Sequence, residues 1–432
     1  MERIYGNAYV VVAAASSRNC EQGFIQRTDR ILFPFNTNSN VTHAFGIYSP
    51  LYKAKRVEDL VFSPWLERGW TFQERIASTR ILMFTERNIH FKCQSFSESM
   101  GTAKDTFEDD YIMLDRKTID SGNTAAMYHE WDKKVAQVNL GYHQFTRKTD
   151  VLPSIAGIAA LFSKKLRDEY AAGLWKNSMH QSLCWGLLSR ATTSYEGLLK
   201  SLHTPSPCIA PSWSWASQSQ WISFNIYGSP PLADYRPEFD SLETNITLRG
   251  ESVFGEVRDA ALDITSKLFV GTQRITYYRT LPQLDLPQES VRFDGRYFAE
   301  IKPDFSVEDI FESHGTHTLA APISFLVIGS ATQRHVDADL FPSTHPSNSE
   351  TLGCDTDAGP DYESSSSPSM SAESGDGLEK ETRLGRAAYG LLIHPAGNPN
   401  EYYRVGTFVS TPYMAGGLSL FDNVEVRTVR LV

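Results

Sequence analysis

The chain has 432 residues, 41% of them apolar and 21% charged, which is enough to bury a substantial core and to form two or three domains. The 51 acidic and 41 basic residues give a net charge of −10, which disfavours nucleic acids and anionic membrane surfaces as partners. Eleven acidic residues and one lysine lie between Val336 and Thr382, so the remainder of the chain is neutral. The surrounding stretch, about 335–384, is rich in Ser, Asp, Glu, Gly and Pro, which predicts a disordered acidic insert.

The spacing of the cysteines and the hydropathy of the chain argue against several further classes of protein. The five cysteines are widely spaced and indicate neither a disulfide framework nor a zinc site, and the histidines lack metal-ligand spacing. No apolar run approaches the roughly 20 residues needed to cross a bilayer, so we expect no membrane span. Ala8 to Ala15 faintly resembles a signal peptide, but it is equally compatible with a buried strand, and we prefer the strand. A cytoplasmic protein with reduced thiols and no metal or cofactor is expected.

The first structured block predicts a helix followed by a hairpin. Ser63 is a candidate N-cap, and helical spacing of apolar residues predicts one helix from Pro64 to Ala77. Alternating apolar residues predict two strands, Arg80 to Phe84 and Ile89 to Cys93, joined by a polar turn.

The middle of the chain, 101–209, predicts a helical region. Trp131, Val135 and Val138 share one helical face, and a second helix follows Asp150 with basic residues in its last turn. The apolar run from Leu174 to Leu187 predicts a third helix.

From Ala210 onward, short β-type runs separated by Gly and Pro predict an antiparallel sheet. Strands on either side of the insert can still pair, because closure entropy grows slowly with loop length. The fold class is therefore α+β, with segments 1–100, 101–209 and 210–432. The expected strands are Ser212 to Ala216, Asn245 to Leu248, Ala261 to Ile264, Ile275 to Tyr278, Pro322 to Ile328, Tyr389 to Ile393 and Val405 to Val409.

Several motifs, taken in order, resemble fungal heterokaryon-incompatibility (HET) domain proteins. The resemblance implies that 1–100 is the C-terminal half of a HET domain with a partial TIR-like α/β fold. HET domains ordinarily begin well before these motifs, so we expect this chain to lack the N-terminal half of the domain. The motifs are Met1-x-x-Ile4-Tyr5-x-x-Ala8, Arg68-x-Trp70-Thr71-Phe72-Gln73-Glu74, Phe84 through Cys93, Asp150-x-Leu152-Pro153-Ser154-Ile155-Ala156-Gly157-Ile158-Ala159, Ala172-Gly173-Leu174-Trp175, Ala210-Pro211-Ser212-Trp213-Ser214-Trp215-Ala216-Ser217 and Tyr402-x-Arg404-Val405-Gly406-x-Phe408.

Glu74 is the candidate catalytic residue, with Trp70 in support. The two are four residues apart and share a face of the predicted helix. NAD-cleaving TIR domains carry a glutamate at this spacing from a tryptophan, and a carboxylate stabilises the oxocarbenium-like state of glycosidic cleavage. Alternatively, Glu74 pairs with Arg68, Arg75 or Arg80 and fixes the helix against the hairpin. We favour this structural role, because we expect the chain to lack the half-domain that would complete a nucleotide pocket.

Trp213 and Trp215 provide a second candidate site, with Trp221 nearby. On a strand, the first two would point to the same side and could stack on a sugar or a nucleobase. The alternative, which we prefer, is that they pack the β-rich region onto the helical layer.

These observations predict a fungal nonself-recognition protein, truncated or degenerate, that acts with protein partners in programmed cell death. The first alternative is a TIR-like NAD glycohydrolase that uses Glu74, with NAD as substrate only. The second is a carbohydrate or nucleotide binder that uses Trp213 and Trp215.

Overall fold

The computed structural model has an α+β fold, as the sequence predicts. The acidic insert predicted at about 335–384 lies outside the described residues, so its disorder stays a prediction. The structure describes residues 2–24, 32–36, 42–46, 60, 63–86, 89–99, 113–138, 143–203, 210–224, 232–279, 289–311, 318–333, 385–412 and 416–432.

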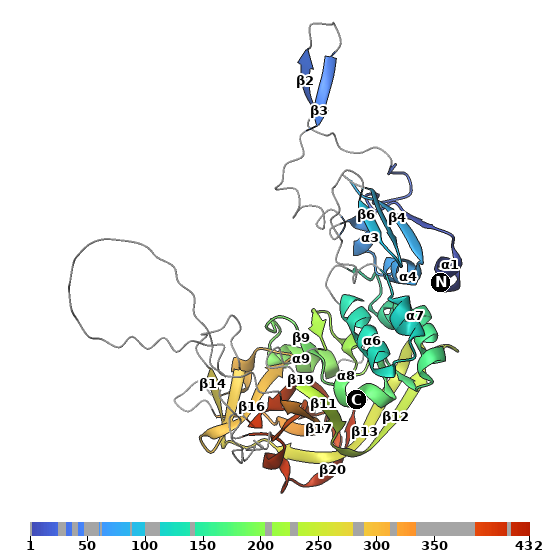
Figure 1. Ribbon diagram of the computed structural model, residues 1–432. Coiled ribbons are helices and arrows are strands. Elements are labelled where there is room, and N and C mark those ends of the chain that lie inside the picture. The colour runs from blue at the N-terminus through green and yellow to red at the C-terminus, as the bar shows by residue number, and fades with distance from the viewer. Residues whose placement is uncertain are drawn as a thin grey trace, which may run out of the picture.

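A small sheet forms the N-terminal part of the structure (Figure 1). After α1 (Glu2–Asn7), strand β1 (Val11–Ala13) pairs in parallel with β4 (Arg80–Phe84), which pairs antiparallel with β5 (Ile89–Cys93). The predicted hairpin is thus confirmed with the same bounds. Every second residue of β1 and β4 is buried in one cluster, as expected for strands with one covered face. Strand β6 (Ser97–Ser99) extends this sheet, and β2 (Leu32–Asn36) pairs with β3 (Thr42–Gly46) in a separate hairpin.

The prediction of a single helix from Pro64 to Ala77 is wrong, because the helix is interrupted in the middle of this stretch. Two helices, α3 (Pro64–Glu67) and α4 (Thr71–Ala77), occupy this stretch. The predicted cap is correct, since the Ser63 hydroxyl accepts a hydrogen bond from the Leu66 amide at 3.3 Å.

The break between α3 and α4 is caused by a segment from farther along the chain. Arg68 is extended, with φ −82° and ψ 122°, and forms a β-bridge with Gln144. The Gly69 amide donates to the Gln144 carbonyl at 3.0 Å. The Phe145 ring lies where a Cβ on Gly69 would be, so this position requires glycine.

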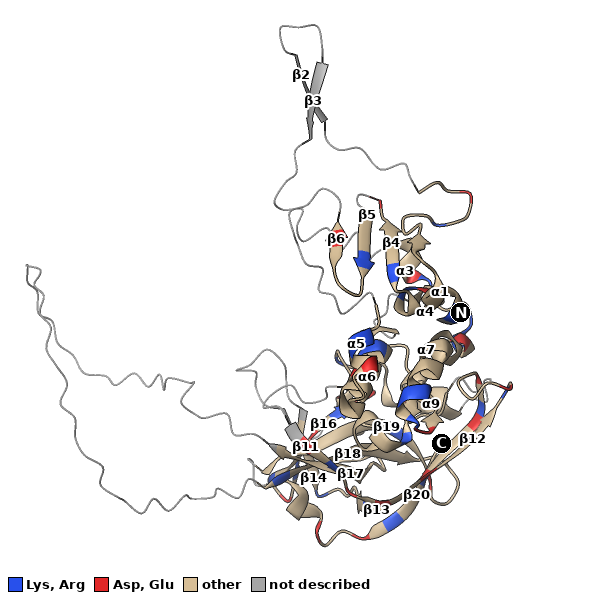
Figure 2. Cartoon of the chain, turned by 45° about the vertical axis from the view of Figure 1, so that its right-hand side comes forward, with Lys and Arg blue, Asp and Glu red and all other residues tan. Residues whose placement is uncertain are grey.

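The helical layer lies between the small sheet and the larger C-terminal sheet, and Figures 1 and 2 agree on this order. Both predicted helices are present, as α6 (Thr124–Val138) and α7 (Val151–Leu166). Trp131 of α6 meets Phe162 of α7 edge to face, with ring centroids 5.3 Å apart. A short helix, α5 (Arg116–Asp120), precedes them, and α9 (Tyr195–His203) follows.

The third predicted helix, Leu174 to Leu187, is wrong. A tight turn opens the stretch, because Ala172 and Gly173 have positive φ angles of 44° and 99°. Most of the run is buried, and a short, largely apolar run does not by periodicity alone distinguish a helix from short strands and turns. It contains β8 (Leu174–Trp175), which pairs with β7 (Tyr170–Ala171), then α8 (Met179–Ser182) and β9 (Gly186–Leu187).

The C-terminal sheet contains ten strands and is antiparallel except for one parallel pair, β19 with β20. Six of the seven predicted strands fall in it. The seventh, Ser212 to Ala216, is wrong, because this stretch is a turn that leads into a 3₁₀ helix at Trp215–Ser217. The strands are β11 (Leu232–Pro237), β12 (Phe239–Leu248), β13 (Val257–Val270), β14 (Ile275–Arg279), β15 (Glu289–Phe293), β16 (Arg296–Pro303), β17 (Ser324–Gln333), β18 (Arg386–Pro395), β19 (Glu401–Ser410) and β20 (Val426–Leu431).

Five of these strands pair in a closed ring. Strand β17 pairs with β13, β13 with β20, β20 with β19, β19 with β18, and β18 again with β17. The pairing of β17 with β18 confirms that strands on either side of the insert can pair. Closure leaves these strands few free edges, which protects their backbone groups from unwanted pairing.

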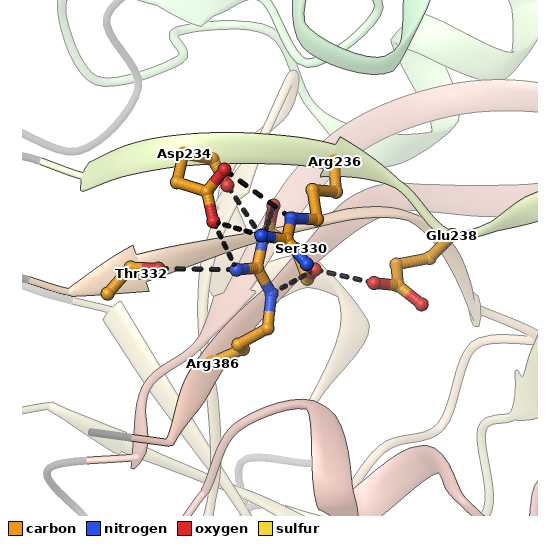
Figure 3. A network of polar contacts seen from close by, with 6 residues as sticks. All are labelled: Asp234, Arg236, Glu238, Ser330, Thr332 and Arg386. Carbon is orange, nitrogen blue, oxygen red and sulfur yellow. Dashed lines mark hydrogen bonds and ion pairs between the residues drawn. The ribbon is translucent and has the colours of Figure 1, made fainter. Parts of the chain in front are cut away.

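An arginine network holds the ends of β17 and β18 to β11 (Figure 3). The Arg386 guanidinium lies 2.8 Å from both the Asp234 carboxylate and the Ser330 hydroxyl, and it also donates to the Thr332 hydroxyl at 3.2 Å. Ser330 in turn donates to Glu238 at 2.5 Å. The network lies where the chain leaves β17 and re-enters β18.

One core cluster joins the three parts of the fold. It combines Phe72 and Ile76 of α4 with the buried faces of α6 and α7 and with inward residues of the large sheet. A second cluster, which includes Phe298 and Phe408, fills the other side of the large sheet. The α4 helix is therefore anchored in the same core as the C-terminal sheet.

Candidate functional site

Glu74 lies in the first turn of α4 and is half-buried. Its carboxyl group accepts hydrogen bonds from the side chains of Tyr5 in α1 and Trp65 in α3. Those side chains offer a hydroxyl and an indole N–H as donors. Glu74 thereby ties three helices together at one carboxylate.

Burial has the largest effect on the pKa of the Glu74 carboxyl group. It raises the pKa of the Glu74 carboxyl above its ordinary value, and the two hydrogen bonds and the nearby Arg68 charge only partly oppose this. The pKa of the Tyr5 hydroxyl is also raised, first by burial and then by the Glu74 charge and hydrogen bond. A carboxyl group with a raised pKa keeps its proton to a higher pH than an exposed carboxyl group does.

Trp70 immediately precedes α4, and 39% of its surface is exposed. Its indole N–H donates to the Asp150 carboxylate at 3.3 Å, just before α7 begins. The two side chains therefore bond to different neighbours. Trp70 bonds to the helical layer through Asp150, whereas Glu74 bonds to α1 and α3. Their catalytic and supporting roles stay predictions.

Comparison with known proteins identifies the segment that contains this site. Residues 1–74 match the model of a family described as heterokaryon incompatibility protein (HET). The N-terminal segment is therefore similar to the HET domain. No curated protein and no solved structure matches the chain. The resemblance is thus confirmed over 1–74, which we call the HET segment and which includes Tyr5, Trp65, Trp70 and Glu74.

Sequence reasoning missed Tyr5 and Trp65 as partners of Glu74 in the HET segment. Tyr5 is part of a motif that carries the resemblance, but no spacing in the sequence brings α1 onto α4. Trp65 lies inside α3, two residues after the Ser63 cap, and the only clue in the sequence was that a buried indole N–H usually finds a hydrogen-bond acceptor.

The three arginines proposed as partners of Glu74 have different surroundings. Arg68 acts on Glu74 electrostatically. Arg75 is buried, with its guanidinium 5.4 Å from the centre of the Phe72 ring. Arg80 lies over the Tyr9 ring and donates to the Tyr9 carbonyl at 3.3 Å.

Trp213 and Trp215 belong to the core, as preferred from the sequence. Both are completely buried. The Trp215 indole donates to the Gly173 carbonyl at 3.0 Å, and the Trp185 indole donates to the Trp213 carbonyl at the same distance. Neither ring offers an exposed face, so a stacking platform on this pair is wrong. Trp221 is 38% exposed.

The part of the chain that the structure describes contains no group of three His, Cys, Asp or Glu side chains that could hold a metal ion. None of its helices is long and apolar enough to span a membrane.

Proposed function

We propose that the chain acts in heterokaryon incompatibility, as a nonself-recognition protein of a fungal cell whose signalling leads to programmed cell death. The observation that supports this most strongly is the family match over the HET segment, residues 1–74. The proposal includes a cytoplasmic location and protein partners in the same signalling pathway.

The contacts of the HET segment suggest how it communicates with the rest of the chain. Trp70 reaches Asp150 at the start of α7, and Arg68 and Gly69 bridge to Gln144. Phe72 lies in the core shared with the large sheet. Recognition by the C-terminal region could act on the HET segment through these contacts, because they join rigid elements on both sides.

Gene disruption tests the proposed role. Disrupting the gene in its own species should let fused cells survive with at least one genetically unlike strain that the parent strain rejects. The matched control is the same strain with the intact gene restored. If every rejected pairing remains rejected after disruption, the proposed role is wrong.

A second candidate function is hydrolysis of NAD at Glu74. The observation that favours it is the half-buried carboxyl group with a raised pKa, because such groups are common in active sites. Glu74 would then stabilise the developing positive charge on the ribose, with NAD as substrate and no further cofactor. Nicotinamide release by the native chain and by Glu74→Gln tests this candidate.

A further inference from the structure

The ten-residue strand β12 lies at the outer margin of the large sheet, as Figures 1 and 2 both show. It pairs with β13 alone and stands outside the closed ring of strands. Within the described part of the chain, the backbone of residues 241–247 makes no hydrogen bond to a loop or a turn. An edge strand of this kind presents a row of unpaired N–H and C=O groups, which can pair with an added strand.

Strand β12 lacks most of the features that usually block pairing at a sheet edge. It contains no proline and no lysine or arginine. Its register against β13 shifts only near its two ends, so the pairing of residues 241–247 is regular. Prolines, lysines and mid-strand bulges are the ordinary means by which proteins protect such edges. The middle of β12 is therefore a suitable template for a further strand.

The two sides of β12 differ in character, and they define what an added strand would meet. Side chains of one side are exposed and polar, whereas those of the other side are half-buried and mostly apolar. Because side chains alternate along a strand, an added strand would also need one polar and one apolar side. The exposed side chains are Ser241, Glu243, Asn245 and Thr247, and the half-buried apolar ones, which pack against the core, are Leu242, Ile246 and Leu248.

The charges on this part of the sheet select a basic partner. Glu243 is paired in register with Asp263 of β13, and like charges directly opposite each other are unfavourable. Arg430 forms an ion pair with Asp263 at 2.9 Å, whereas none of the described residues forms an ion pair with Glu243. A cation that an added strand placed opposite Glu243 would relieve the repulsion.

A second copy of the same strand fits this edge poorly. The two charged residues of β12, Asp240 and Glu243, are both acidic. Pairing of two β12 strands therefore sets no opposite charges against each other in any register. A partner strand with alternating basic and apolar residues would match the charge and the apolar side together.

We propose that the free edge of β12 binds an extended segment of a partner protein, in which Lys or Arg alternates with apolar residues, as an added strand of the large sheet. Backbone hydrogen bonds supply affinity in this mode of binding, and the basic residue opposite Glu243 supplies specificity. The surface lies outside the HET segment. Such docking does not require a role in heterokaryon incompatibility, because either one can hold when the other fails.

Peptide binding to the full 432-residue chain tests the proposal by fluorescence anisotropy. The first peptide alternates Lys and Val over about eight residues, the length of an ordinary strand. The second alternates Glu and Val, and the third has the composition of the first with its lysines and valines in separate blocks. The alternating Lys and Val peptide should bind at least about fivefold more tightly than either of the others. Equal binding of the block peptide would show general attraction to an acidic chain and would overturn the proposal, as would no binding at all.

A charge reversal locates the site. Glu243→Lys should weaken binding of the alternating Lys and Val peptide at least about threefold and should make the Glu and Val peptide bind more tightly than it does to the native chain. The latter gain cannot arise from unfolding. The matched control is Glu196→Lys, exposed on α9, which should bind both peptides like the native chain. Unchanged peptide preference in Glu243→Lys would refute the assignment.

Hydrogen exchange distinguishes an added strand from side-chain contact alone. The alternating Lys and Val peptide should slow amide exchange in residues 241–247 of the native chain, because its backbone accepts hydrogen bonds from the outer edge of β12. Binding that leaves exchange in this segment unchanged would overturn the proposed strand pairing.

Discussion

Arg404 and Asp304 form an ion pair in which both side chains are buried. The Arg404 guanidinium also donates to the carbonyls of Leu183 and Trp185 and lies 3.3 Å from the centre of the Trp185 ring. One arginine of β19 thus joins the large sheet to the stretch between α8 and β9. Removal of one member of such a pair leaves the other charge buried without compensation.

We therefore expect Arg404→Met to lower the free energy of unfolding by about 3 to 5 kcal/mol. Urea denaturation measures this change. The matched control is Lys165→Met, because Lys165 pairs with Asp120 at 2.9 Å on the surface and should contribute little. Equal effects of the two substitutions would show that burial does not set the importance of the Arg404 pair.

Trp215→Ala should lower the free energy of unfolding by about 3 to 5 kcal/mol, because it empties a fully buried site and removes the hydrogen bond to Gly173. Trp221→Ala, at a site 38% exposed, is the comparison and should lower it by about 1 kcal/mol or less. Denaturation curves of the two variants measure both changes in the free energy of unfolding. A stable Trp215→Ala protein would contradict the core assignment.

His143 should make stability depend on pH. Its pKa is lowered to about 3 in the folded chain, mainly by burial, whereas the unfolded value is near 6.5. The folded chain therefore binds fewer protons, and stability should fall as the pH drops below about 6.5 toward 3. His143→Phe should make the loss of stability between pH 6.5 and about 4 less steep than in the native chain. The exposed His129→Phe is the control, and an identical slope in native and His143→Phe chains would contradict this account.

Glu74 should not support NAD cleavage in this chain. Tyr5 and Trp65 already hydrogen-bond its carboxyl group, so the group is held by the protein rather than presented to a substrate. We expect nicotinamide release by the purified chain to equal background and Glu74→Gln to change nothing. Turnover that disappears in Glu74→Gln would establish the enzymatic candidate instead.

The elements predicted correctly from sequence are those whose signal is local. The hairpin of β4 and β5 follows from alternating apolar residues around a polar turn, and Ser63 caps α3 as its position suggests. The break at Gly69 could not be foreseen, because its cause is Phe145, a ring from another part of the chain. The burial of Trp213 and Trp215 was foreseen from residue type, whereas their turn conformation depends on contacts with Gly173 and Trp185.

The candidate site was predicted only in part for the same reason. Glu74 was singled out by its spacing from Trp70, but its hydrogen-bond partners come from α1 and α3. A cavity of about 930 Å³ beside Asp304 has no signature in the sequence, because its wall is assembled from seven separate stretches of the chain.

Cell viability after induced expression in a filamentous fungus tests most directly whether the chain signals through its HET segment. Three proteins should be compared at equal abundance: the native chain, Gly69→Val, which would displace the Phe145 ring from the HET segment, and Gly250→Val, where a Cβ meets nothing within 4 Å. We predict that the native chain and Gly250→Val kill the cells, whereas Gly69→Val spares them. Survival with the native chain, or equal killing by Gly69→Val, would contradict the account.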